Sequence, residues 1–391
     1  MSKIKKLYLE LCMCSVFHSV KEKQLFSCFS EYARNDGELD AKINAYSAFV
    51  SEIYKSGGSL TEAVKRLVFE DENVYVKERA KKREPNENIK TAVERELSVF
   101  EAIASLSPAD FASNMGISYV SPFSSEKCDF ISEYERRILD IDKHGYGIFA
   151  RNPMFRLSDT GELAPIVSAD KTTLDSFIGY KAERDMVIAN TRAFVEGRPA
   201  ANTLLCGDAG TGKSSTVKAV ANAFFEEGVR LIELRKDQLS SLPYVMGMIS
   251  ENPLKFIIFI DDLSFNQNDD NFSMLKAALE GSASAKAPNA VIYATSNRRH
   301  IVKETFDDRY GEDVHRNDTI QETLSLSERF GLVVLFQKPN KALYLEIVHE
   351  LAERHGVKMD RGELDIKAEA FALRRGNRSA RCAEQFILSL L

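Results

Sequence analysis

The sequence predicts an α/β fold, in which a parallel sheet follows a mostly helical N-terminal region. Two observations support this fold class. From Leu174 onward, apolar strands and amphipathic helices alternate, which is typical of a parallel sheet with helical crossovers. In residues 1–142, apolar side chains instead recur at helical spacing, as in the series Ile43, Tyr46 and Val50. Such stripes ordinarily form the core between helices.

The composition is that of an ordinary globular protein. The chain has 391 residues, enough for two or three domains, of which 44% are hydrophobic and 28% charged. No uncharged apolar run approaches the roughly 18 residues that span a bilayer, so we expect no membrane insertion. The net charge of −6 argues against a general affinity for nucleic acid. Six scattered cysteines are typical of reduced thiols, so we expect a cytoplasmic protein.

Residues 143–173 separate the two regions, and we expect them to form a linker. Within them, Met154 and Leu157 before a turn, and Leu163 after it, predict a short hairpin. The glycines of residues 145–150 also match the dinucleotide-binding pattern G-x-G-x-x-A. We reject that interpretation, because a charged helical run precedes the pattern where a buried strand is required.

The most specific motif is Gly207–Ser214, which fits the phosphate-binding pattern G-x-x-x-x-G-K-[ST]. An apolar strand at 202–206 precedes it, and an amphipathic helix at 214–227 follows it. Glycines let the loop turn its N–H groups toward phosphate oxygens, and the helix N-terminus adds partial positive charge. We expect an exposed Lys213 to reach the β- and γ-phosphates and Ser214 to bind Mg²⁺. The expected nucleotide-binding residues here are Gly207, Asp208, Ala209, Gly210, Thr211, Gly212, Lys213, Ser214 and Ser215.

Two carboxylates end a second apolar strand, Phe256–Asp262. A buried parallel strand with acids at its carboxyl end places them beside the nucleotide. We expect Asp261 to hold Mg²⁺ through water and Asp262 to orient or activate the attacking water. Another buried strand, Ala290–Asn297, ends in an asparagine.

The order of these motifs resembles that of the AAA+ ATPases, where they are called Walker A, Walker B, sensor 1, arginine finger and sensor 2. The resemblance assigns sensor 1 to Asn297 and the arginine finger to Arg329. It assigns sensor 2 to Arg378, with Arg381 as the next candidate. These side chains also have plainer interpretations: a turn-forming asparagine, an exposed arginine at a strand entry, and a solvated basic face.

Two further likenesses extend this resemblance. The segment Phe177–Tyr180, which contains Ile178 and Gly179, resembles the AAA+ motif that packs near the adenine. The chain is still more similar to the bacterial family of predicted ATP-binding proteins called domain of unknown function 815. The strings that carry this likeness, between Gly145 and Gly331, are GYGIFA, SFIGY, GTGKSS, DDLSF, LKAALEGS, YATSNRRH and SLSERFG. The first 140 residues carry no matching motif.

The resemblance implies a P-loop NTPase core with a five-stranded parallel sheet, a helical lid, and ATP between them. We therefore expect a helical N-terminal region at 1–142, the linker at 143–173, the AAA+ core at 174–337 and the lid at 338–391. Most AAA+ proteins have Asp-Glu where this chain has Asp261 and Asp262. Bacterial replication initiators share the Asp-Asp pair, so hydrolysis is compatible with it, and the shorter side chain points to a slow rate.

These features predict an ATPase that uses ATP and Mg²⁺ to drive a conformational change in itself or in a macromolecular partner. The alternative is a nucleotide-gated binding or loading module with little turnover. A small-molecule kinase is disfavoured, because the order of Asn297, Arg329 and Arg378 is not a kinase arrangement. The resemblance also implies a homo-oligomer in which one subunit's arginine completes its neighbour's site. We expect the partner to be a protein rather than a nucleic acid.

Overall fold

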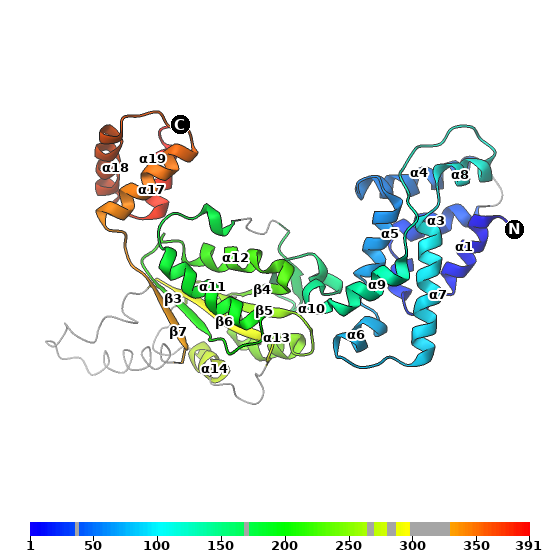
Figure 1. The fold of residues 1–391 in the computed structure, drawn as a ribbon, viewed down its shortest axis with the longest axis horizontal. Helices are drawn as coiled ribbons and strands as arrows, with labels where there is room; N and C mark the ends of the chain where they lie inside the picture. Colours follow the sequence, from blue (N-terminus) through cyan, green and yellow to red (C-terminus); the bar gives the residue numbers. More distant parts are fainter. Residues whose placement is uncertain (36–38, 168–171, 264–269, 280–286, 298–328) are drawn as a thin grey trace. The chain divides into compact units, whose positions relative to one another are not determined.

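A computed structural model describes residues 1–35, 39–167, 172–263, 270–279, 287–297 and 329–391. Parts of the DDLSF, LKAALEGS, YATSNRRH and SLSERFG strings therefore lie outside the described residues. The chain divides into two compact units, Met1–Ala150 and Arg151–Leu391 (Figure 1). The division falls within the residues that we expected to be a linker.

The first unit is helical, and aromatic rings fill its core. Phe17 packs edge to face against both Phe100 and Tyr134, with ring centroids 5.6 and 5.7 Å away. Glu96 is only 5% exposed, and its carboxylate accepts hydrogen bonds from the N–H groups of residues 15–17. This buried acid thus serves the fold of the unit. The helices are α1 (Lys3–Cys12), α2 (His18–Lys21), α3 (Gln24–Arg34), α4 (Leu39–Lys55), α5 (Leu60–Phe69), α6 (Val74–Ala80), α7 (Glu87–Ala104), α8 (Pro108–Met115), α9 (Phe130–Leu139) and α10 (Ile141–His144).

The second unit contains a seven-stranded sheet with the strand order β2-β1-β4-β5-β6-β3-β7. Its strands are β1 (Met154–Leu157), β2 (Leu163–Pro165), β3 (Thr203–Gly207), β4 (Val229–Leu234), β5 (Lys255–Ile260), β6 (Ala290–Ser296) and β7 (Leu332–Phe336). Neighbours from β4 to β7 are all parallel, which confirms the α/β class and the five predicted parallel strands.

The predicted hairpin forms, but it is part of the sheet. β1 and β2 pair antiparallel, and β1 also pairs in parallel with β4, with Met154 opposite Leu231. Met154, Phe155 and Leu157 are buried. Without β1, the edge of β4 would carry unpaired N–H and C=O groups, so the hairpin protects that edge. Part of the segment that we expected to be a linker therefore belongs to the sheet, which has two strands in addition to the five predicted.

Helices cover both faces of the sheet (Figure 1). α11 (Lys181–Val195) and α12 (Lys213–Ala223) lie on one face, and α13 (Leu242–Ile249) and α14 (Asp270–Leu279) lie on the other. Because both faces are covered, every residue of β3 is buried, and β5 is buried from Phe256 to Ile260.

Three helices end the chain: α17 (Lys341–Arg354), α18 (Arg361–Arg375) and α19 (Ala380–Leu388). They share an apolar cluster that includes Tyr344, Ile347 and Phe386. Among the helices that the structure describes, none is both long and apolar enough to cross a membrane.

Candidate functional site

The carboxyl ends of three parallel strands bring together the main nucleotide-site residues that the sequence predicts. Gly207 ends β3, Asp261 follows β5, and Asn297 follows β6. β6 lies between β3 and β5 and is parallel to both, so these three ends meet at one edge of the sheet. In open α/β sheets this edge is where ligands bind.

The phosphate loop has a backbone that side chains would obstruct. Gly207 has φ 135°, and a methyl group there would lie 2.0 Å from the Phe336 carbonyl oxygen. α12 begins at Lys213, and its N-cap is Gly212, with φ 89°. The first N–H groups of a helix have no partner within the helix, so this end is suited to bind an anion. The other nominated loop residues, Asp208, Ala209, Gly210, Thr211 and Ser215, lie along the same stretch.

Lys213 is buried rather than exposed, which corrects the expectation from the sequence. It is 5% exposed, and its ammonium donates to the carbonyl oxygens of Gly207 and Asp208 at 3.0 and 2.8 Å. A third bond, 2.9 Å long, reaches Oδ1 of Asn297. Burial lowers the pKa of the Lys213 amine below its usual value, although the nearby acids oppose this shift. The Lys213 ammonium group thus lies against the backbone of the loop.

The carboxylates of Asp261 and Asp262 contact different residues around Lys213. Asp261 Oδ1 accepts a hydrogen bond of 2.6 Å from the Ser214 hydroxyl. Asp262 Oδ1 accepts one of 2.8 Å from the amide of Asn297. Asn297 therefore bridges Lys213 and Asp262, while Ser214 joins the helix start to Asp261.

Asp262 has an uncommon backbone conformation. Its φ is +52°, in the left-handed region, where a residue other than glycine costs of order 1 kcal/mol or more. Aspartate and asparagine tolerate this region better than most residues. The turn after β5 is thus a strained point beside the candidate reaction centre.

Thr295 is a site residue that the sequence prediction missed. It is 2% exposed, and its hydroxyl donates to Asp261 Oδ1 at 2.5 Å. The Thr295 hydroxyl oxygen also accepts the N–H of Asp262, at 2.9 Å. Its position, two residues before the nominated Asn297 and on the strand next to β5, was the available signal.

Ile178 and Gly179 lie where the sheet unit meets the C-terminal helices. Ile178 packs against the apolar cluster of α17–α19. A methyl group at Gly179 would lie 2.7 Å from a side-chain carbon of Leu343, so these segments approach closely. The next residue, Tyr180, donates from its hydroxyl to the Gln337 carbonyl oxygen at 2.6 Å. The segment thus contacts both the end of β7 and the last three helices.

The two arginines proposed for sensor 2 have different surroundings. Arg378 forms a two-bond ion pair with Glu369, with N–O distances of 2.7 and 3.1 Å. Arg381 lies in the first turn of α19, and its backbone N–H donates to the Gly210 carbonyl oxygen at 3.4 Å. Of these two arginines, Arg381 is therefore the one whose main chain contacts the phosphate loop.

Arg329 lies at the other edge of the sheet. It is half-exposed and precedes Leu332, the first residue of β7, which pairs with Thr203 at the start of β3. The structure therefore separates Arg329 from the loop of its own chain by the length of β7. A role at the phosphates requires the arginine of another subunit.

The residues at the carboxyl edge fit a nucleoside triphosphate and a magnesium ion. The glycine loop and the start of α12 suit phosphate oxygens, and Lys213 supplies a positive charge. In the described parts of the chain, no cluster of three or more His, Cys, Asp or Glu side chains is placed to hold a metal. Mg²⁺ is often held by one or two side chains together with substrate phosphates, and Ser214 and Asp261 offer two such side chains here.

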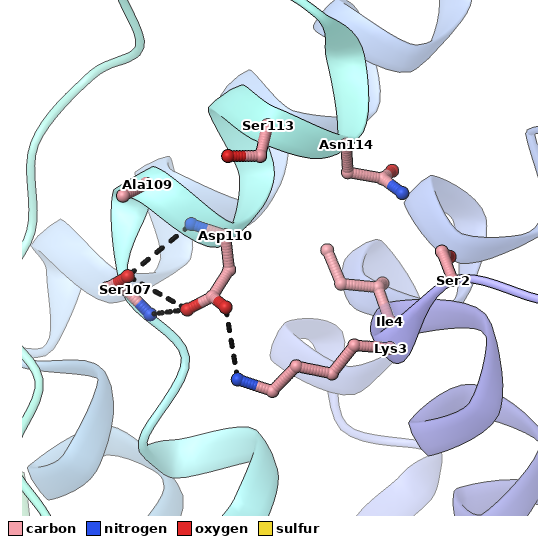
Figure 2. A pocket seen from close by; sticks show the side chains of 8 residues that line it. All are labelled: Ser2, Lys3, Ile4, Ser107, Ala109, Asp110, Ser113 and Asn114. Atoms are coloured by element: carbon pink, nitrogen blue, oxygen red, sulfur yellow. Dashed lines mark hydrogen bonds and ion pairs between the residues drawn. The ribbon is translucent and has the colours of Figure 1, made fainter.

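A pocket in the first unit is explained by local structure. Figure 2 shows this pocket, of about 460 Å³, between the starts of α1 and α8. Asp110 bonds the backbone and hydroxyl of Ser107 in a capping box and pairs with Lys3 at 3.0 Å. These polar groups satisfy one another, so we assign the pocket no role.

Among the comparisons with known proteins, the family match agrees with the sequence resemblance. Residues 150–391 match the model of the family described as "Protein of unknown function (DUF815)". Solved structures of Thermotoga maritima RuvB, described as a Holliday junction branch migration motor, are also similar. One has 14% identity, a TM-score of 0.34, and a match over 56% of this chain and 70% of that chain. A mutant of that protein has 15% identity, a TM-score of 0.34, and coverage of 56% and 71%. No curated protein matches this chain.

Proposed function

This chain belongs to the DUF815 family, and we propose that it binds ATP with Mg²⁺ and hydrolyses it to drive a conformational change in itself or in a partner. The observation that carries this proposal is the set of contacts around the phosphate loop. Lys213 contacts Asn297, Asn297 contacts Asp262, and Ser214 contacts Asp261. Such a set of groups suits phosphoryl transfer, in which positioning and charge stabilisation provide most of the catalysis.

Each group has a definite task in this proposal. Lys213 would bind the β- and γ-phosphates, and Ser214 and Asp261 would hold the metal ion. A bound magnesium ion would neutralise part of the charge on the phosphates. Asp262 and Asn297 would orient the attacking water, and Asp262 would accept its proton.

A second candidate function is a nucleotide-gated binding or loading module that turns over little ATP. The observation that favours it is Asp262 itself, which is shorter than the usual glutamate and already accepts a bond from Asn297. Turnover at saturating Mg-ATP, measured with and without candidate partners, separates the two functions. A rate well above background supports the ATPase, whereas tight binding without turnover supports the module.

We further propose that the chain forms a homo-oligomer and acts on a macromolecular partner, a protein rather than a nucleic acid. The net charge of −6 supports a protein partner, because nucleic-acid binding relies on positive charge. An Asp262→Asn variant loaded with ATP is the bait of choice, since it would hold the nucleotide-bound form.

Lys213→Ala should weaken Mg-ATP binding about 30-fold or more, because removing one partner of a close charge pair costs 2 kcal/mol or more. Calorimetric titration of the folded variant measures this effect. Lys218→Ala is the matched control, since Lys218 lies on the same helix and pairs with Glu233 at 3.4 Å. Unchanged affinity in Lys213→Ala would refute the assignment of the loop.

Arg381→Ala should weaken ATP binding about tenfold or more, since a hydrogen bond to a charged group contributes roughly 1.5–3 kcal/mol. Arg378→Ala should change the affinity less, because its guanidinium is paired with Glu369. Parallel titrations of the two variants make the comparison, with thermal unfolding as the control for the lid. A larger loss in Arg378→Ala would support Arg378 as the sensor-2 residue.

A further inference from the structure

The Thr295 hydroxyl contacts the carboxylate of Asp261 and the backbone N–H of Asp262, the two candidate catalytic acids. We infer that Thr295 is a positioning residue, whose hydroxyl orients Asp261 toward the metal ion and fixes the turn at Asp262. This inference rests on the proposed function and deepens it, because it names the group that sets the metal dependence of nucleotide binding. Thr295 itself touches neither nucleotide nor metal in this role.

Three hydrogen bonds connect Thr295 with three successive residues after β5. Its hydroxyl donates to Asp261 Oδ1 at 2.5 Å and accepts the Asp262 N–H at 2.9 Å. Its carbonyl oxygen accepts the Leu263 N–H at 2.6 Å. Since a hydroxyl has a single hydrogen, these two side-chain bonds use its donor and one acceptor position. Thr295 therefore contacts the entire turn that carries the two carboxylates.

Two hydroxyl groups and one backbone N–H, that of Asp262 at 3.2 Å, donate to the Asp261 carboxylate. Ser214 and Thr295 both donate to its Oδ1, from the phosphate-loop helix and from β6 respectively. Such partners of a metal-binding carboxylate fix its orientation and strengthen metal binding. When Mg²⁺ binds, the Ser214 hydroxyl is also a proposed metal ligand. The Thr295 hydroxyl then continues to hold the carboxylate in place, together with the Asp262 N–H.

The second task of Thr295 concerns the strained turn. Asp262 has φ +52°, a conformation that persists only where the surroundings enforce it. Two hydrogen bonds hold Asp262 in this conformation. Its backbone N–H donates to the Thr295 hydroxyl, and its carboxylate accepts from the Asn297 amide. The left-handed turn directs the Asp262 carboxylate to Asn297. Thr295 thus supports the water-orienting pair as well as the metal ligand.

Two substitutions separate the hydroxyl of Thr295 from its shape. Thr295→Val keeps the shape and removes the hydroxyl, whereas Thr295→Ser keeps the hydroxyl. ATP affinity is measured by calorimetry on the full chain, first in EDTA and then at increasing Mg²⁺. We expect Thr295→Val to raise the half-saturating Mg²⁺ concentration about tenfold or more. Its affinity in EDTA should stay within about twofold of the wild type, because the phosphate loop is unchanged, and Thr295→Ser should restore the Mg²⁺ response.

The chain offers a closely matched control in the first unit. Thr61 is also 2% exposed, and its hydroxyl lies 3.0 and 3.2 Å from the carbonyl oxygens of Ala104 and Glu126 and accepts the Glu126 N–H at 2.8 Å. Thr61→Val therefore removes a buried hydroxyl that, like that of Thr295, donates to an oxygen and accepts a backbone N–H, and it should leave the Mg²⁺ response unchanged. If Thr295→Val does not fold, Thr295→Ala takes its place, since alanine removes the hydroxyl without adding bulk.

A double variant tests whether Thr295 acts through Asp261. In the Asp261→Asn background, Thr295→Val should cause no further change in the Mg²⁺ response, because the carboxylate it orients is gone. A full additional change, or a wild-type response in the single Thr295→Val variant, would overturn the inference alone. A wild-type protein whose ATP binding ignores Mg²⁺ would overturn the proposed function as well, so the two failures are distinguishable.

Discussion

Arg329→Ala is expected to lower ATP turnover about 10³-fold or more and to leave ATP affinity unchanged. An arginine that reaches the transferring phosphoryl group stabilises the charge that grows on its oxygens, and such arginines are worth at least this factor. The residue is half-exposed and directly precedes the buried Phe330 at the entry to β7.

The position of Arg329 in the sheet explains why we expect it to act on a neighbouring subunit. β7 has five residues, and at about 3.3 Å per residue it separates Arg329 from the carboxyl edge by roughly 17 Å. An arginine side chain does not span that distance. The phosphate site of an isolated subunit would therefore have no arginine from a neighbour beside it. Specific activity should rise with protein concentration as oligomers form.

Mixing two inactive variants tests this arrangement directly. Arg329→Ala still binds ATP, and Lys213→Ala still carries Arg329, so a mixed oligomer contains interfaces with all the necessary groups. Some activity should return on mixing, provided that both variants are folded by circular dichroism. Activity that is independent of concentration, together with no recovery on mixing, would assign Arg329 a structural role and favour a monomeric nucleotide switch.

Asp262→Asn should lower turnover by a factor of about 10² to 10⁴, the usual contribution of a general base, while ATP affinity is retained. Asparagine suits this test because it tolerates the left-handed backbone that Asp262 adopts, with φ +52°. The variant therefore changes the charge of the side chain and preserves the turn.

Asp261→Asn provides the paired comparison for this prediction. It should weaken both the Mg²⁺ response and turnover, since Asp261 is bonded to Ser214 at the metal side. Single-turnover rates and calorimetric affinities for both variants distinguish the two roles. Full activity in both variants would mean that the paired carboxylates serve the fold rather than the reaction.

The sequence alone predicted the features that depend on neighbours along the chain. The G-x-x-x-x-G-K-S spacing identified the phosphate loop, because the loop's geometry follows from its own glycines. Unbroken apolar runs identified β5 and β6, and strand ends in a parallel sheet meet at a common edge. For these reasons the sequence also predicted that Asp261, Asp262 and Asn297 lie near the loop.

Only the tertiary structure decided the features that depend on residues far apart in the chain. β1 belongs to the sheet because the edge of β4 accepts it, and no pattern within residues 143–173 reveals that pairing. Lys213 is buried because three acceptors from two segments surround it. Thr295 contacts the Asp261 carboxylate and the Asp262 N–H because of the register of β6 beside β5. Such contacts arise from packing between distant segments, whereas local spacing determines only the elements that pack.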